Sequence, residues 1–180
     1  MRFVVYLLLP LWTVSFSLRA IRQSLSVSLM IAGTFSNPPV GGEVPSKQLN
    51  LDKTTIAKIV GEDITLRQAL VTADFTRSIY SEDCKFQDEI DTYPIDKYIQ
   101  GTKALFNADK SHVDLDGPVV VEGTTVSFPF KEKLTFNLPF NPYVYLTGHV
   151  DLTRGQDGLI AYSREHWDQS VAEVISHVKF

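Results

Sequence analysis

One acidic side chain in this sequence of 180 residues is placed where proton-transfer chemistry would need it. Apolar and polar residues alternate from position 84 to position 90, which is the two-residue period of a β-strand. One face of that strand carries Cys84, Phe86, Asp88 and Ile90. A carboxylate among apolar neighbours must find hydrogen bonds or a cavity, because otherwise its pKa rises. Asp88 is therefore our candidate general base, and Phe86 is a candidate wall of a ligand pocket.

Other side chains could complete such a site. Tyr80 and Tyr98 each carry a hydroxyl that could donate to an oxyanion formed by proton abstraction, and Tyr98 is also a candidate pocket residue. Trp167, near the end of the last predicted strand, is a third candidate pocket residue. Glu165 and His166 are adjacent on that strand, so their side chains must point to opposite faces.

His149 is the third candidate catalytic residue. It lies with Asp151 on a long strand predicted over residues 143–153, and both side chains share a face with Tyr143 and Tyr145. Histidine performs general acid–base catalysis near neutral pH, which suits dehydration or cyclisation. A solvated or dimer-forming strand surface explains the same residues equally well, and both interpretations stay open.

Composition and motifs disfavour several functions. The formal net charge is −4, with 17 basic and 21 acidic residues, so nucleic acid is not an expected partner. Cys84 is the single cysteine, which rules out an intrachain disulfide and a thiolate zinc site. No His-x-His or His-x-x-x-His pair occurs, and we expect no metal. No glycine-rich phosphate loop or Gly-x-Ser-x-Gly motif occurs, and we expect no cofactor.

The first 50 residues are typical of a targeting presequence. Arg2 precedes an apolar run that is shorter than the about 20 residues needed to span a bilayer, which predicts a signal peptide over residues 1–17. Residues 18–50 begin as a basic, serine-rich segment with no acidic residue before Glu43, and they end in a Pro/Gly-rich linker. The first part of this segment has the composition of an organellar transit peptide.

A signal peptide followed by such a segment resembles the bipartite presequences of plastids gained by secondary endosymbiosis. The resemblance implies import into a plastid, to the stroma or the thylakoid lumen. Plain secretion is the alternative. In either case we expect no stable membrane span after processing.

Residues 51–180 form the predicted domain, and its first half is mainly helical. Asp52 is the predicted N-cap of a helix that ends near Gly61, and Asp63 the predicted N-cap of a second helical stretch. A third helix is expected to begin at Pro94. Between the second and third helices, Ser81–Asp83 is interpreted as a solvated turn before the strand that carries Asp88.

The second half is expected to be β-structure. Strands alternate from residue 111 onward, and Lys131–Lys133 is interpreted as a solvated turn between two of them. Gly155–Gly158 is the predicted hairpin turn, and a short helix with Val171 and Val174 is expected to end the chain. Helices followed by an antiparallel meander predict an α+β class, with the helices on one face of the sheet.

Two passages then carry a family likeness. Ile79-Tyr80-Ser81-Glu82-Asp83-Cys84-Lys85-Phe86-Gln87-Asp88, and an ending of hairpin, strand and Glu165-His166-Trp167-Asp168, resemble the nuclear transport factor 2-like superfamily. The ending resembles that of SnoaL-like domains and of a plant and algal branch of unassigned activity. The likeness covers roughly residues 52–178 and implies a cone of helices on a curved, mostly antiparallel sheet. In the ketosteroid isomerases of this superfamily, the position of Asp88 holds the general base. No second acid is identified on an inward face.

Three functions are compatible with these observations. The first is a pocket domain that binds a small hydrophobic ligand in an organelle. The second is a non-catalytic module that forms a homodimer or grips a partner through the tyrosine-rich strand face. The third is a cofactor-free isomerase, cyclase or dehydratase that uses Asp88 as its base. A cavity of several hundred Å³ walled by Asp88 favours a pocket, and a filled cone favours the module.

Overall fold

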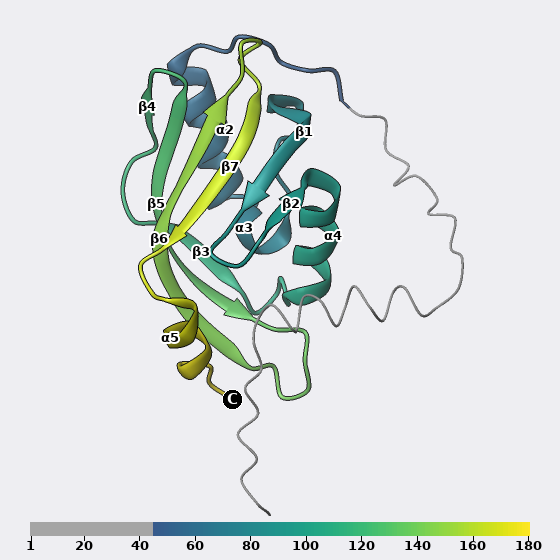
Figure 1. Cartoon of the computed structure of the whole chain (residues 1–180), viewed down its shortest axis with the longest axis vertical. Helices are drawn as coiled ribbons and strands as arrows, with labels where there is room; N and C mark the ends of the chain where they lie inside the picture. The colour runs from purple at the N-terminus through teal and green to yellow at the C-terminus, as the bar shows by residue number, and fades with distance from the viewer. Residues whose placement is uncertain (1–44) are drawn as a thin grey trace, which may run out of the picture.

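The computed structural model describes residues 45–180 (Figure 1). The predicted signal peptide over residues 1–17, and the transit-like segment as far as residue 44, lie outside the described residues. The last residues of the predicted linker are bonded to the domain. Gln48 donates its backbone N–H to the carbonyl of Ser78, and Asn50 donates to the carbonyl of Asp157. The packed unit therefore includes these residues as well as the predicted domain.

The described chain alternates short helices with the strands of one sheet. In the first half are α2 (Lys53–Thr65), α3 (Ala69–Thr72), the 3-10 turn η1 (Arg77–Ile79), β1 (Tyr80–Gln87), β2 (Thr92–Pro94) and α4 (Ile95–Leu105). In the second half are β3 (His112–Leu115), β4 (Val120–Glu122), β5 (Thr125–Thr135), β6 (Tyr143–Arg154), β7 (Ile160–Trp167) and α5 (Val171–Ser176). No helix of the described part is both long enough and apolar enough to cross a membrane.

The strands form a single curved sheet in the order β2-β1-β7-β6-β5-β3, with β4 also paired to β5. Every pairing is antiparallel except that of β1 with β7. Figure 1 shows α2, α3 and α4 together on one side of this sheet, while α5 follows the end of β7 and lies beside the start of β6. The predicted α+β class, with helices on a curved and mostly antiparallel sheet, is confirmed.

The two longest strands show why one face became the core. On β6 the buried residues alternate with more exposed ones, as an apolar/polar period of two dictates. The inward face of β6 carries Val144, Leu146, Gly148, Val150 and Leu152. The outward face carries the predicted set that includes Tyr145 and His149. Phe128 and Phe130 of β5 extend the inward face and are almost fully buried, because the helices cover them.

The first helix confirms one predicted cap and corrects another. The carboxylate of Asp52 accepts hydrogen bonds from the backbone N–H groups of Thr54 and Thr55, as an N-cap should. The helix does not end near Gly61, because α2 continues to Thr65. The predicted cap Asp63 is therefore a buried residue inside α2, where its carboxylate accepts two hydrogen bonds from Thr76. Burial raises the pKa of Asp63, and the Thr76 hydrogen bonds oppose that rise.

Ser81–Asp83 is not a turn, because these residues lie within β1. The register of β1 on β7 shifts between Tyr80 and Lys85, and the intervening residues are accordingly more exposed than the rest of the strand. A charged, irregular strand segment can have the same residue composition as a solvated turn. The prediction that Ser81–Asp83 form a turn is therefore wrong, but the prediction that they are accessible to solvent is right.

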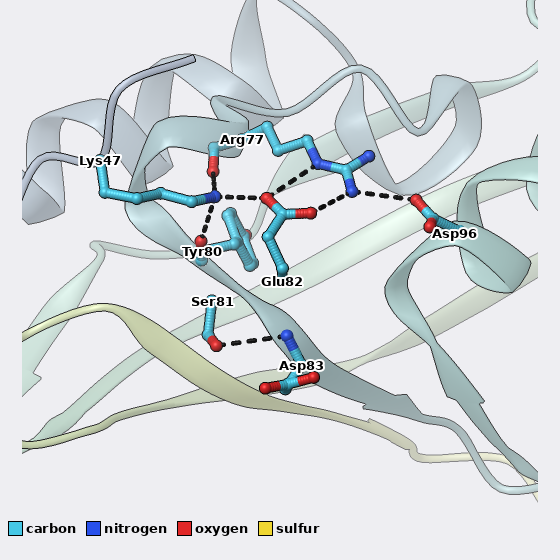
Figure 2. Close-up of polar contacts among 7 residues, drawn as sticks. All are labelled: Lys47, Arg77, Tyr80, Ser81, Glu82, Asp83 and Asp96. Carbon is cyan, nitrogen blue, oxygen red and sulfur yellow. Dashed lines mark hydrogen bonds and ion pairs between the residues drawn. The ribbon is translucent and has the colours of Figure 1, made fainter. Parts of the chain in front are cut away.

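That irregular segment is held by an ion-pair cluster of Lys47, Arg77, Glu82 and Asp96 (Figure 2). The Glu82 carboxylate accepts hydrogen bonds from both Lys47 and Arg77, and Arg77 also reaches Asp96 at the start of α4. Lys47 Nζ donates as well to the backbone carbonyls of Arg77 and Tyr80, at 3.1 and 2.7 Å. The Glu82 cluster therefore ties the N-terminal segment, β1 and α4 together.

Lys131–Lys133 is the second corrected turn. These residues lie in the middle of β5, a strand of 11 residues whose alternation runs unbroken from Val126 to Leu134. Glu132 shares the inward face with Phe130 and Leu134 and is only 5% exposed. Position 132 is on the buried face of β5 by its place in the alternation, and the residue at this position is a glutamate.

Candidate functional site

A cavity of about 30 Å³ lies between α4, α5 and the inward face of β5, β6 and β7. Most of its wall is apolar, from residues of both layers: Leu70, Ile90, Leu105, Phe106, Leu134, Phe136, Val144, Leu146 and Val174. Its polar lining comes from Tyr98, Thr102, Glu132, Glu165 and the indole of Trp167. In this conformation the volume holds about one or two water molecules. A few polar groups converging on an apolar hollow are the usual composition of a ligand site.

Glu132 is the unusual member of this wall. It lies opposite Leu146 in the register of β5 with β6, with apolar residues before and after it on the same face. Moving a carboxylate from water into such surroundings costs free energy, and an apolar side chain would fit the sheet equally well. Burial of an acid among apolar residues is unusual, and here it places a carboxylate on the wall of the cavity.

Glu165 is a second acid on the inward face, where the sequence alone identified none. It lies opposite Val150 on β7, and its carboxylate accepts a hydrogen bond from the indole N–H of Trp167. That bond fixes one oxygen of Glu165 and the plane of the Trp167 ring. Trp167 also lines the cavity, and its role as a ligand-binding residue stays a prediction.

A smaller cavity of about 20 Å³ lies on the α2 side of the first. Tyr80 and Phe86 line it together with buried Asp63, and Tyr98 and Leu70 line both cavities. The two hollows are therefore separated by the side chains of Tyr98 and Leu70. Together they have far less volume than the several hundred Å³ of a ligand pocket, so the interior of the cone is mostly filled.

Tyr80 is buried at the start of β1, where its ring packs against Phe75 and Phe86 with centroids 4.6 and 5.8 Å away. Burial raises the pKa of the Tyr80 phenol well above its usual value, and the nearby Asp63 carboxylate adds to the rise. The hydroxyl therefore stays protonated, and it could donate a hydrogen bond to a ligand. Tyr80 does not line the cavity that holds Glu132 and Glu165.

Asp88 is buried, at 8% exposure, as the alternation predicted. It follows the last residue of β1, and its Oδ1 accepts hydrogen bonds from the backbone N–H groups of Ile90 and Asp91, at 2.8 and 2.9 Å. These bonds fix the turn into β2. Asp88 lines neither of the two described cavities. Its role as a general base stays a prediction, and its observed role is to hold this turn.

His149 lies on the outward face of β6, away from both cavities. The register of β6 with β7 places it directly opposite His166, and the two imidazoles stack with centroids 4.5 Å apart. Asp151 lies beside both rings. The structure therefore separates His149 from the other predicted catalytic residues and gives it different neighbours.

Cys84 is fully buried in the core under the helices. Burial raises the pKa of its thiol to about 12, so at neutral pH the thiol is protonated and is not a nucleophile. This agrees with its interpretation as a small buried hydrophobe on a strand.

Two functional candidates, Glu132 and Glu165, were missed in the sequence. A signal for Glu132 existed, because it continues the alternation of Phe128, Phe130 and Leu134. Because Lys131 and Lys133 flank Glu132, the three charged residues are interpreted from the sequence as a solvated turn and not as part of a strand. Glu165 could be assigned to a face of β7 only once the register of that strand was known.

Comparison with known proteins bears on the fold. AclR of Streptomyces galilaeus, whose description proposes a hydroxylase, matches 68% of this chain and 96% of its own, with a TM-score of 0.50 and 14% identity. A nuclear transport factor 2-like protein of unknown function from Burkholderia pseudomallei matches 72% of this chain and 100% of its own, with a TM-score of 0.50 and 12% identity. No protein-family model matches the chain, and no curated protein does. At these identities the likeness concerns architecture alone.

Proposed function

The described domain has the nuclear transport factor 2-like fold, and on that premise we propose that it binds a small, mainly apolar molecule carrying a hydrogen-bond donor in the cavity between α4 and the sheet. The observation that carries this proposal is the pair of acids, Glu132 and Glu165, on the wall of one apolar hollow. A hydroxyl or amine of the ligand would donate to Glu132, while its apolar body would lie against Trp167 and the aliphatic wall. Carboxylate acceptors in a mainly apolar hollow bind such donors more strongly than they do in water.

The size of the ligand depends on Tyr98. A molecule of more than a few atoms exceeds about 30 Å³, so it needs more space than the cavity now has. Rotation of the Tyr98 ring away from Phe86 would open one side of the partition that Tyr98 and Leu70 form between the two cavities. Binding is therefore proposed to proceed with displacement of this ring, which is only partly buried and lies on the short helix α4.

Native mass spectrometry of the full chain purified from its own compartment tests the proposal, because a retained ligand adds a defined mass to each subunit. Once such a ligand is found, Glu132→Gln should weaken its binding by about tenfold or more, since the charged acceptor is lost but the shape is kept. Glu122→Gln, on the short strand β4 and outside the cavity, is the matched control and should bind as the wild type does. Binding unchanged in Glu132→Gln would remove the observation that carries the proposal.

A second candidate function is assembly through the outward face of the sheet, and the mostly filled interior favours it. Tyr145 is 59% exposed there and lies edge-to-face with Tyr143, with ring centroids 5.8 Å apart. Exposed tyrosines on a flat strand face supply large contact area to a second copy. Sedimentation equilibrium should then give a homodimer that Tyr145→Ser weakens, and a monomer at all concentrations would exclude this function.

The place where the domain works is proposed from residues 1–50, which resemble a bipartite plastid presequence. We propose delivery to a plastid, and secretion is the alternative. A fusion of residues 1–50 to a fluorescent protein, expressed in a cell with a secondary plastid, tests this. Fluorescence in the plastid agrees with the proposal, and fluorescence in the medium or the secretory pathway contradicts it.

A further inference from the structure

Three side chains of two adjacent strands, β6 and β7, meet on the outward face of the sheet, opposite the cavity. His149 and Asp151 lie on β6, and His166 lies on β7 directly across from His149. One ligand atom of each residue lies within 4.8 Å of those of the other two, and all three side chains are accessible to solvent. We propose that His149, Asp151 and His166 bind one divalent transition-metal ion, with Zn²⁺ as its simplest representative.

The orientation of the carboxylate supports this site. Ser127 Oγ donates a hydrogen bond to Asp151 Oδ1, at 2.5 Å. The other oxygen, Oδ2, faces both histidines and lies 3.9 Å from the Nε2 atom of each. One oxygen is thus held by the protein, and the second is directed at two imidazole nitrogens at equal distance.

The distances suit an ion after a small adjustment. Zn²⁺ binds imidazole nitrogen and carboxylate oxygen at about 2.0–2.2 Å in a tetrahedron, which places neighbouring ligand atoms roughly 3.3 Å apart. The three ligand atoms therefore need to approach by roughly 1 Å, which side-chain rotation can supply at an accessible site. Three protein ligands would leave the fourth position for water or another small ligand.

The surroundings of His166 resemble those of a metal-bound histidine. Its Nε2 faces Asp151, while its Nδ1 lies 3.8 Å from Glu89 Oε1. Metal-binding histidines commonly present the second ring nitrogen to a carboxylate, which sets the tautomer and orients the ring. Glu89 is itself held by Arg164, whose NH2 donates to Oε1 at 2.8 Å. Arg164 is the cation among these groups, and it pairs with Glu89. The carboxylates of Asp151 and Glu89 together outweigh its single positive charge, so the cluster attracts a cation.

The choice of metal class follows from the ligands. Two imidazoles and a carboxylate suit Zn²⁺, Fe²⁺, Ni²⁺ or Cu²⁺, whereas Mg²⁺ and Ca²⁺ prefer sites made only of oxygen. Short-range motifs give no sign of this site, because its histidines lie on different strands. The expectation that no metal binds considered only histidine pairs within one element.

The test is titration of the full chain with Zn²⁺ alone. The protein, prepared without a histidine tag and stripped with a chelator, should bind one equivalent in isothermal titration calorimetry, and excess Mg²⁺ should not compete. His149→Gln, His166→Gln and Asp151→Asn should each lower the affinity by about a hundredfold, and Glu89→Gln by about tenfold. The matched control is His112→Gln, since His112 and Asp114 form an exposed His-x-Asp pair on β3 with a 3.1 Å contact.

A second measurement does not depend on the variants. Imidazole ¹⁵N resonances of the wild type should shift at Nε2 of both His149 and His166 when Zn²⁺ is added, and those of His112 and His177 should not. Absence of saturable binding would overturn the proposal. So would equal loss of affinity in His112→Gln, or Zn²⁺ binding unchanged when His149 and His166 are both replaced. The site is independent of the interior cavity, so these outcomes leave the proposed ligand function untouched.

Discussion

The ring of Tyr98 on α4 stacks on the ring of Phe86 on β1, with centroids 4.1 Å apart and planes 12° from parallel. This contact packs α4, the helix that follows the β1–β2 hairpin, against the sheet. Because Tyr98 also lines both interior cavities, the same contact that stabilises the helix keeps the two hollows apart. Stability and access to the interior are therefore coupled at this contact.

Tyr98→Ala should lower the free energy of unfolding by about 2–3 kcal/mol, because it removes the stacked ring and leaves a cavity. It should also join the two hollows and let a small apolar fluorescent probe bind inside. The measurements are denaturant unfolding and probe titration, with near-ultraviolet circular dichroism to confirm native packing. Tyr98→Phe keeps the ring, so it should admit no more probe than the wild type. Native-like Tyr98→Ala protein that takes up no probe would contradict the role of this ring as a partition.

Glu132→Leu tests whether this carboxylate serves a ligand or the fold: if it serves the proposed ligand, the free energy of unfolding should rise by about 1–2 kcal/mol, because an apolar side chain then replaces a buried carboxylate. The same change should abolish binding of any ligand that donates to Glu132. A gain in stability with a loss of binding is typical of a residue retained for function. Denaturant midpoints of wild type and variant measure the first effect. Stability that falls instead would identify Glu132 as a structural residue.

Parts of this molecule could be predicted because one face of an element meets the core and the other meets water. The alternation of β6 and the Asp52 cap are of this kind, since each depends on a few adjacent residues. Lys131–Lys133 and Ser81–Asp83 could not be assigned in the same way. A short polar, charged run can have the same composition in a turn, in an irregular part of a strand and in the middle of a regular strand, so composition alone does not tell these cases apart. Only the packing of distant elements distinguishes these cases.

The pairing of His149 with His166 depends on a detail that the sequence does not display. Gly155–Gly158 was correctly predicted as the hairpin turn between β6 and β7, but the register shifts by one residue between Thr153 and Arg154. A shift of one residue moves every side chain of a strand to the other face. Without that bulge, His149 would lie opposite a different residue of β7, and the metal-binding cluster would not form.

The Glu82 cluster should make stability depend on pH in the acid range. Hydrogen bonds from Arg77 and then from Lys47 lower the pKa of Glu82 to about 2 from its ordinary value of 4.5. A folded-state pKa below the unfolded one stabilises the protein above pH 4.5, and this contribution disappears as the pH falls towards about 2. The carboxylate is 40% exposed, so screening limits the effect to about 1 kcal/mol.

The measurement compares unfolding of the wild type and Glu82→Gln at a series of pH values. The difference in stability should be constant above pH 4.5 and shrink steadily below it. Glu122→Gln, a glutamate on β4 outside this cluster, is the control and should show no such trend. A difference that is the same at pH 3 and pH 7 would mean that the ion pairs are not stabilising.

Gly148→Ala should be among the most damaging small substitutions in the domain. A methyl group at this position would lie 1.9 Å from the backbone oxygen of His166 and 3.2 Å from the ring of Phe130. A backbone oxygen cannot move aside without separating β6 from β7, so we expect a loss of roughly 3 kcal/mol in the free energy of unfolding. Gly101→Ala is the matched control: it lies at an exposed position of α4, where the methyl group meets no atom within 4 Å. Alanine there should stabilise the helix by about 0.5–1 kcal/mol. Thermal unfolding of both variants checks the pair, and equal effects would show that the close approach of β7 to Gly148 does not constrain the sheet.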